Sequence, residues 1–231
     1  MKRNLLIAVL LISFALLISP AIVAAQDSYT ISLEGYTWNH TAITVFIGEH
    51  HAAWYDSSFK AHVETAVSDW NEAVDSFWTK YSDHVTSYIH DVQFQLETDK
   101  KAADVIVTFA LYRGAVPPFA VAGVTGFFTQ RNTNVVRGAT ITIYVASVGA
   151  DPTLIQKTAE HELGHVLGLG HTAQTDDIMY SVVSANLHIT TLDVYGVSNV
   201  FGWYTYSGEN FPDVGYTVPT SATLPETIPY E

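Results

Sequence analysis

The sequence contains no cysteine, and this absence excludes a disulfide framework and any metal site built on thiolates. The fold must therefore be stabilised by its hydrophobic core. Charged residues are also scarce, at 14% of the chain, and the 10 Lys and Arg residues are outnumbered by 23 Asp and Glu. The resulting formal net charge of −13 disfavours binding to phosphate backbones, so we expect no nucleic-acid partner.

Long hydrophobic runs are absent from the sequence except at its beginning. There Lys2 and Arg3 precede an apolar stretch that ends in small residues near Ala25. This order is typical of a secretory signal peptide, residues 1–25, and predicts a secreted, extracellular or cell-surface protein. The alternative is an uncleaved N-terminal anchor, because the stretch is just long enough to span a membrane. If it is cleaved, we expect no membrane association.

The remaining sequence alternates between strand-like and helix-like patterns. Apolar residues recur every two residues in some segments and every three or four in others. Strands are expected at 41–47, 91–97, 103–111, 119–130 and 138–146, and helices at 57–78, 152–167 and 191–201. This order predicts an α+β (mixed α/β) fold over residues 26–206. Residues 207–231 are rich in Pro, Thr, Ser and Gly, which predicts a loosely ordered C-terminal tail.

Three of the ten histidines lie within the segment HELGHVLGLGH, residues 161–171. His161 and His165 are four residues apart on an expected helix, so they share one face. Gly168 lets the chain leave the helix and return, which makes His171 available as a third ligand. Three neutral nitrogen ligands with one open position are the pattern of a catalytic zinc site. Glu162 is placed to accept a proton from a water activated by that metal.

The segment resembles the HExxHxxGxxH motif of the metzincin zinc proteases, and Thr172 and the downstream DDIMY resemble the matrixin branch with its Met-turn at Met179. ITTLDVYGVSNVFG, residues 189–202, is similar to the C-terminal helix of matrixin catalytic domains. The resemblance covers about residues 36–204. It implies a twisted five-stranded sheet with one antiparallel edge strand, plus three helices. It also implies peptide-bond hydrolysis with one catalytic Zn²⁺.

The resemblance further implies that an extended substrate pairs with the edge strand at 121–128. The residues expected to contact it are Val121, Gly123, Val124, Lys157 and Tyr180, with a solvated lysine on the surface of the helix as the alternative for Lys157. The family's second, structural zinc site is expected to be absent, because residues 111–145 contain no histidine. Calcium is possible but unsupported, and latency through a propeptide cysteine is excluded.

The leading prediction is a secreted zinc-dependent endopeptidase acting on protein or peptide substrates. We expect a monomer, although no feature of the sequence determines the oligomeric state. The alternative is a non-catalytic zinc-bound protein that binds peptides or acts in surface adhesion, and the intact Glu162 disfavours it. The sequence identifies neither the substrate nor the cleavage specificity.

Overall fold

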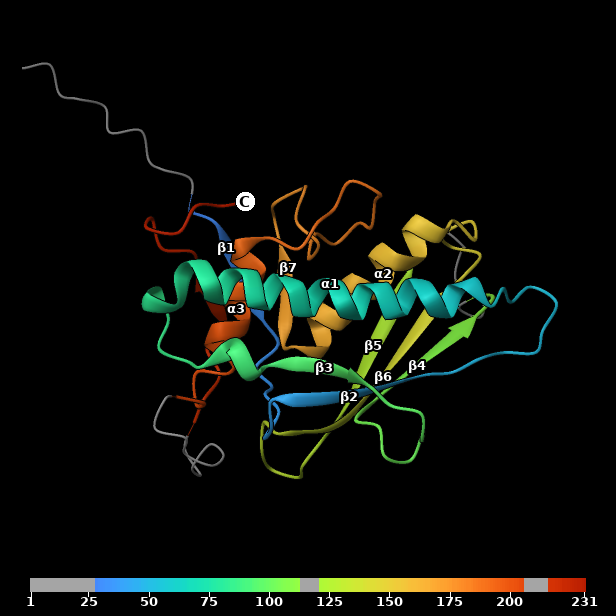
Figure 1. The fold of residues 1–231 in the computed structure, drawn as a ribbon, viewed down its shortest axis with the longest axis horizontal. Helices are drawn as coiled ribbons and strands as arrows, with labels where there is room; N and C mark the ends of the chain where they lie inside the picture. The colour runs from blue at the N-terminus through green and yellow to red at the C-terminus, as the bar shows by residue number, and fades with distance from the viewer. Residues whose placement is uncertain (1–27, 113–120, 206–215) are drawn as a thin grey trace, which may run out of the picture.

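The computed structural model describes residues 28–112, 121–205 and 216–231, and its main sheet has five strands (Figure 1). These are β2 (Ala42–Ile47), β3 (Gln93–Leu96), β4 (Val105–Ala110), β5 (Gly123–Thr129) and β6 (Val136–Tyr144). The strand order is β3-β2-β4-β6-β5, and every pair is parallel except β5 with β6. The predicted five-stranded sheet with one antiparallel edge strand is therefore confirmed. The expected signal peptide lies outside the described residues.

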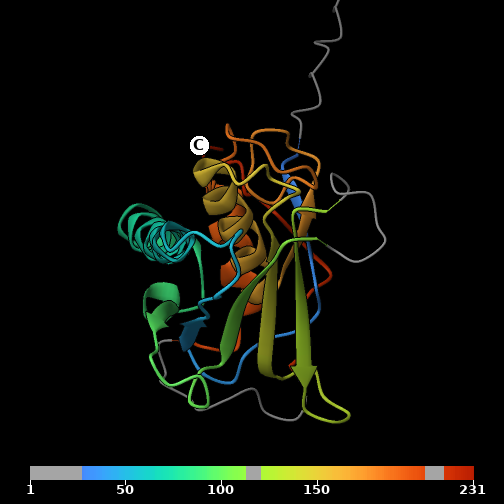
Figure 2. The ribbon, with the colours of Figure 1, turned by 90° about the vertical axis from the view of Figure 1, so that its right-hand side faces the viewer.

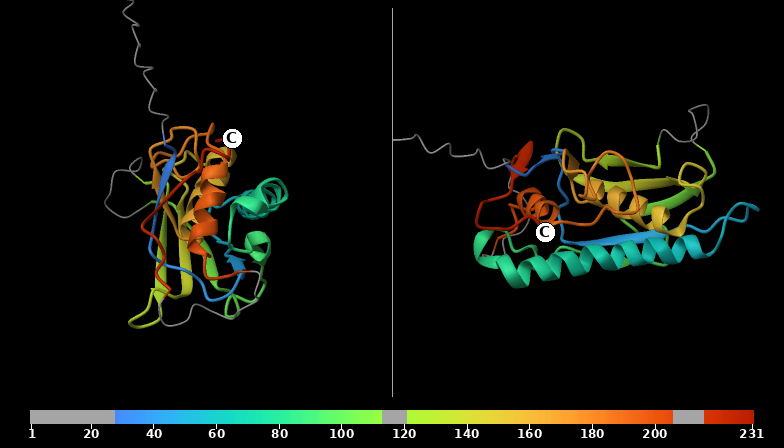
Figure 3. Two further views of the ribbon diagram at one scale, coloured as in Figure 1. Left: turned by 90° about the vertical axis from the view of Figure 1, so that its left-hand side faces the viewer. Right: turned by 90° about the horizontal axis from the view of Figure 1, so that it is seen from above.

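Three α-helices lie on the same side of this sheet (Figures 2 and 3). They are α1 (Ser58–Tyr81), α2 (Pro152–Val166) and α3 (Thr191–Val200), and two short 3₁₀ helices, η1 (Ser82–His84) and η2 (Ile89–Asp91), follow α1. The buried face of α1 is formed by Phe59, Val63, Ala66, Val67, Trp70, Val74 and Phe77. These residues repeat at three- and four-residue steps, which is why the helix was predictable. Within the described residues, no helix has the length and apolar character needed to cross a membrane.

The bounds of α2 follow from residues at both of its ends. The Asp151 carboxylate accepts hydrogen bonds from the backbone N–H groups of Thr153 and Leu154, at 2.8 and 3.2 Å, and Pro152 occupies the first helical position. At the other end Gly168 has a φ of 91°, a conformation that side chains disfavour. The helix therefore begins at the predicted residue and stops within one residue of the predicted end.

A second sheet of three short strands was not predicted. It contains β1 (Thr30–Leu33), β7 (Leu169–Thr172) and β8 (Ser221–Thr223), in the order β7-β1-β8 and antiparallel throughout. Figure 1 shows β1 and β7 at one end of the molecule, next to α3. The sheet joins the first described residues to the segment that follows α2 and to the end of the chain.

The C-terminal segment differs from the predicted tail. Residues 207–215 lie outside the described residues, but residues 216–231 are packed against the domain. Ala222, Leu224 and Ile228 are buried, and the ring of Tyr230 stacks on that of Tyr29 at a centroid distance of 4.3 Å. The hydrogen-bonding partner of this segment, β1, lies far away in the sequence. No local pattern reveals that pairing, so composition alone predicted a loosely ordered tail.

Candidate active site

Two elements bring the three predicted metal ligands together. His161 and His165 lie one turn apart on α2, and His171 lies on β7. The ligand nitrogens of the three histidines are all within 4.8 Å of one another. Gly168 makes this return of the chain possible, because a Cβ atom there would lie 2.8 Å from the Val200 side chain and 3.0 Å from the Tyr36 carbonyl oxygen.

In two of the three histidines, a hydrogen bond to a backbone carbonyl oxygen determines which ring nitrogen is free to bind a metal ion. The Nδ1 atom of His161 lies 2.7 Å from the Ile178 carbonyl oxygen, and that of His165 lies 2.8 Å from the Leu169 carbonyl oxygen. A carbonyl oxygen can only accept, so each Nδ1 carries the proton and each Nε2 keeps its lone pair. Burial lowers the pKa of His161 to about 3 and that of His165 to about 4, which keeps both imidazoles neutral.

These donors fit a zinc ion. Neutral imidazole nitrogens are common zinc ligands, and three of them leave one coordination position open for a water or a substrate. In the part of the chain that the structure describes, no second group of three or more His, Cys, Asp or Glu side chains is arranged to hold a metal.

Glu162 projects from α2 toward the edge strand β5, where it is buried. The Thr125 hydroxyl donates a hydrogen bond of 2.6 Å to Glu162 Oε2 and a longer one of 3.2 Å to the Glu162 carbonyl oxygen. At Gly123 a Cβ atom would lie 2.6 Å from Glu162 Oε1, so the carboxylate occupies space that only a glycine leaves. Burial raises the pKa of Glu162 to about 7, while the hydrogen bond from Thr125 acts in the opposite direction.

Met179 is fully buried next to the helix that carries two of the histidines. Its sulfur occupies the space that a side chain at Gly164 would need, and its carbonyl oxygen accepts a 3.1 Å hydrogen bond from the Thr172 backbone N–H. The predicted Met-turn residue thus packs against α2 and is joined by its backbone to the residue after His171.

Two buried aspartates tie the segment around Met179 to α3. Asp177 Oδ1 accepts from the Met179 N–H at 2.8 Å, and Asp177 Oδ2 accepts from the Thr190 hydroxyl at 2.7 Å. Asp193 Oδ2 accepts from the Thr190 N–H at 2.7 Å, and Thr190 caps α3. Burial raises the pKa of both carboxyls, and the charge of Asp177 raises that of Asp193 further.

A cleft of about 660 Å³ opens between β5, the histidines and the segment after Met179. Val121, Gly123 and Val124, which belong to the predicted edge-strand segment, line it. Tyr180 does not line it, because its neighbours Ser181, Val182 and Val183 form that wall. The other lining residues are Glu34, Tyr36, Ala122, Thr125, Phe127, Ser147, Val148, Leu154, His161, Glu162, His165 and His171.

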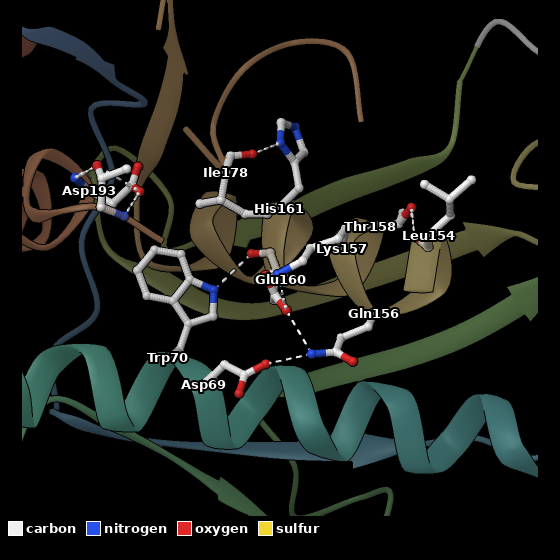
Figure 4. Close-up of polar contacts among 11 residues, drawn as sticks. Asp69, Trp70, Leu154, Gln156, Lys157, Thr158, Glu160, His161, Ile178 and Asp193 are labelled. Carbon is white, nitrogen blue, oxygen red and sulfur yellow. Dashed lines mark hydrogen bonds and ion pairs between the residues drawn. The ribbon is translucent and has the colours of Figure 1, made fainter. Parts of the chain in front are cut away.

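Lys157 does not reach the cleft, contrary to the prediction. Its Nζ atom pairs with Glu160 Oε2 at 2.8 Å, on the side of α2 that faces α1 (Figure 4). Glu160 is almost fully buried and also accepts from the Gln156 amide at 3.0 Å. Burial raises the pKa of Glu160 to about 7, and the nearby Lys157 ammonium opposes that rise. The ion pair draws the lysine away, and Leu154 contributes to the cleft instead.

Several residues of the site were not predicted. Thr125 shares one face of β5 with Gly123, so strand alternation could have identified it once Gly123 was placed. Glu34 and Tyr36 lie more than 100 residues before the histidines, and no local pattern connects the two regions. The carbonyl groups of Leu169 and Ile178 act through their backbone, so no side-chain pattern marks them.

Comparison with known protein families assigns this fold and site to a class. The profile of the family described as Matrixin matches residues 37–202, most of the chain. The chain therefore belongs to the matrixin family. Members of this family are zinc-dependent, and the triad His161, His165 and His171 is positioned to bind a metal ion.

The similar proteins include animal and plant relatives. Stromelysin-1 from Rattus norvegicus is 41% identical over 78 residues, which is 31% of this chain and 15% of that protein. Metalloendoproteinase 2-MMP from Arabidopsis thaliana is 35% identical over 72 residues, which is 30% of this chain and 18% of that protein. The matched segment is thus less than a fifth of the length of each of these relatives.

Proposed function

We propose that the protein is a zinc-dependent endopeptidase in which Glu162 is the general base. The observation that carries this proposal is the placement of a buried carboxylate beside three converging imidazoles, in a cleft that runs along a free sheet edge. His161, His165 and His171 would hold the zinc ion. When bound, zinc lowers the pKa of a water and polarises the carbonyl of the scissile peptide bond.

Glu162 performs the proton transfers in this mechanism. Its carboxylate removes a proton from the attacking water as the water oxygen bonds to the carbonyl carbon. The same carboxyl then delivers that proton to the amide nitrogen as the C–N bond breaks. Thr125 holds one carboxylate oxygen and leaves the other free for these transfers. The carbonyl groups of Ile178 and Leu169 keep two of the imidazoles in the orientation that the metal requires.

The substrate would be a protein or peptide bound in an extended conformation. Among the described residues, β6 is the one strand that pairs with β5, so the opposite edge of β5 can pair with a further strand. Val121, Gly123 and Val124 would provide those contacts. The leader-like sequence at residues 1–25 supports secretion or retention at the cell surface.

The test compares the parent with Glu162→Gln, which keeps the shape of the side chain but cannot accept the proton. We expect the Gln variant to hold about one zinc per chain, as the parent should. It should bind peptide with similar affinity and hydrolyse unfolded casein at least 10²–10⁴-fold more slowly, the range typical of a lost general base. Removing the metal with a chelator should abolish the parent's activity.

The control is Glu72→Gln, which makes the same change at an exposed position of α1 outside the cleft. Its activity should match the parent's. A Glu162→Gln variant that cuts at the parental rate would contradict the assignment of the base. A parent that binds zinc and peptide but cuts nothing would indicate the non-catalytic peptide-binding or adhesion protein.

A further inference from the structure

Part of the lining of the cleft comes from residues that precede the region shared with the family. Glu34 and Tyr36 line the cleft, whereas the family match begins at residue 37. They follow directly after β1, which pairs with β7 between Leu33 and Leu169. The Glu34 N–H donates a 2.9 Å hydrogen bond to the Gly168 carbonyl oxygen. The second sheet thus positions Glu34 and Tyr36, which form an additional wall of the cleft.

Glu34 gives this wall a carboxylate, and no lysine or arginine of the described residues pairs with it. The Glu34 side chain is 38% exposed, and its Oε1 atom lies 3.6 Å from His165 Nδ1. Across the described residues, no lysine or arginine lies within ion-pair distance of this carboxylate. Among the described residues, those that line the cleft include two glutamates and no lysine, arginine or aspartate. A cationic side chain of a substrate could pair with Glu34 without displacing any lysine or arginine of the described residues.

Two aromatic rings line the same cleft as this carboxylate. The rings of Tyr36 and Phe127 have centroids 5.4 Å apart and an interplanar angle of 41°, and both residues line the cleft. A lysine or arginine side chain is attracted both to an aromatic face and to a carboxylate. The combination therefore suits a long cationic side chain better than an acidic one.

The position of these rings along β5 defines which substrate residue would reach them. Phe127 is two residues beyond Thr125 on the same face of the strand. Thr125 contacts Glu162, so it marks the reacting centre. A substrate strand paired alongside β5 would present one side chain level with Phe127, about two residues from the one level with Thr125.

We infer that Glu34, together with Tyr36 and Phe127, forms a subsite that selects a lysine or arginine side chain of the substrate, about two residues from the residue level with Thr125. This inference rests on the proposed endopeptidase function. A single partly exposed ion pair with an aromatic contact should favour the cationic peptide by roughly threefold to tenfold.

The experiment uses a set of fluorogenic peptides in which one Arg, Gln or Asp is placed in turn at each position around the cleaved bond. For the parent we expect kcat/KM to favour Arg over Gln at one position. Glu34→Gln should remove that preference, measured as the ratio of kcat/KM for the Arg and Gln peptides, because any general change in activity cancels in this ratio. Glu34→Lys should favour the Asp peptide at the same position.

Two further measurements separate this inference from other effects. Binding of the Arg and Gln peptides to the Glu162→Gln protein measures the same preference without turnover. Glu72→Gln tests whether the net charge alone is responsible, and it should keep the parental preference. A parent that cleaves none of the peptides overturns the proposed function. A parent that cleaves them without the Arg preference, or a preference that survives Glu34→Gln, overturns the subsite.

Discussion

At the scale of single residues, the contact between Thr125 and Glu162 carries the clearest mechanistic consequence. The hydroxyl is a donor to a buried carboxylate, and hydrogen bonds to charged groups contribute about 1.5–3 kcal/mol. Thr125→Val keeps the shape of the side chain but removes this donor. We expect kcat to fall roughly 10–100-fold with little change in KM, since the lost contact orients the base and does not bind substrate.

The control for this prediction is Thr125→Ser, which restores the hydroxyl and should recover most of kcat. Steady-state kinetics on one fluorogenic peptide, with zinc content measured on each preparation, checks it. A valine variant that loses zinc, or one in which only KM rises, would show that Thr125 has a different role.

The residues of the site differ in how far the sequence could reveal them. His161, Glu162, His165 and His171 follow from spacing within one helix and the turn after it, so local geometry was sufficient. The position of Lys157 was predicted wrongly, because helical spacing indicates which face of the helix a side chain lies on but not which buried partner it contacts. Its partner Glu160 is three residues further along the same helix.

At the scale of elements, the C-terminal segment shows the largest departure from the sequence-based expectation. Ile228 is 2% exposed although it lies in a stretch without regular structure. Removing most of a buried isoleucine typically costs about 2–5 kcal/mol. We therefore expect Ile228→Ala to lower the free energy of unfolding by an amount in that range, measured by urea titration.

The matched substitution is Glu226→Ala, an exposed neighbour in the same segment, which should change stability by less than about 0.5 kcal/mol. Equal stability of the two variants would mean that the segment does not pack as described.

The reason β1 and β8 escaped prediction is physical. Each has four residues or fewer, and each gains its hydrogen bonds from strands far away along the chain.

At the scale of the whole molecule, the buried pair Asp177 and Asp193 should make stability depend on pH. Both carboxyls have a raised pKa in the folded protein, so the folded state binds more protons than the unfolded state. Their contribution to stability is fully present below the unfolded pKa of about 4 and is lost as pH rises through the folded values. Asp193→Asn retains an oxygen that can accept from the Thr190 N–H but cannot ionise.

We expect the unfolding free energy of Asp193→Asn, relative to the parent, to increase between about pH 4 and pH 7. The measurement is urea unfolding at several pH values, with a chelator present in both samples so that metal binding does not contribute. Asp83→Asn, at an exposed position, should follow the parent at every pH. Parallel curves for the parent and Asp193→Asn would contradict the prediction.

The order of strands and helices, and hence the class of fold, was largely readable from the sequence. Alternating patterns and continuous apolar runs gave the strands of the main sheet, and their antiparallel edge followed from the resemblance carried by the histidine segment. The second sheet could not be predicted from the sequence, because it forms only where the two ends of the domain come together at β1. The same contacts place Glu34 and Tyr36 in the lining of the cleft. The part of the cleft that was not predicted from the sequence is therefore the part formed by long-range contacts.

The position of β1 between β7 and β8 also determines how the molecule would carry mechanical load. A pull on the chain before Thr30 acts along a central strand, so its hydrogen bonds to both neighbours resist in shear. The Ser32 hydroxyl in that strand donates a 2.7 Å hydrogen bond to the His171 carbonyl oxygen. Tension applied to the chain before Thr30 would therefore act on the backbone of the third metal ligand as well as on the second sheet.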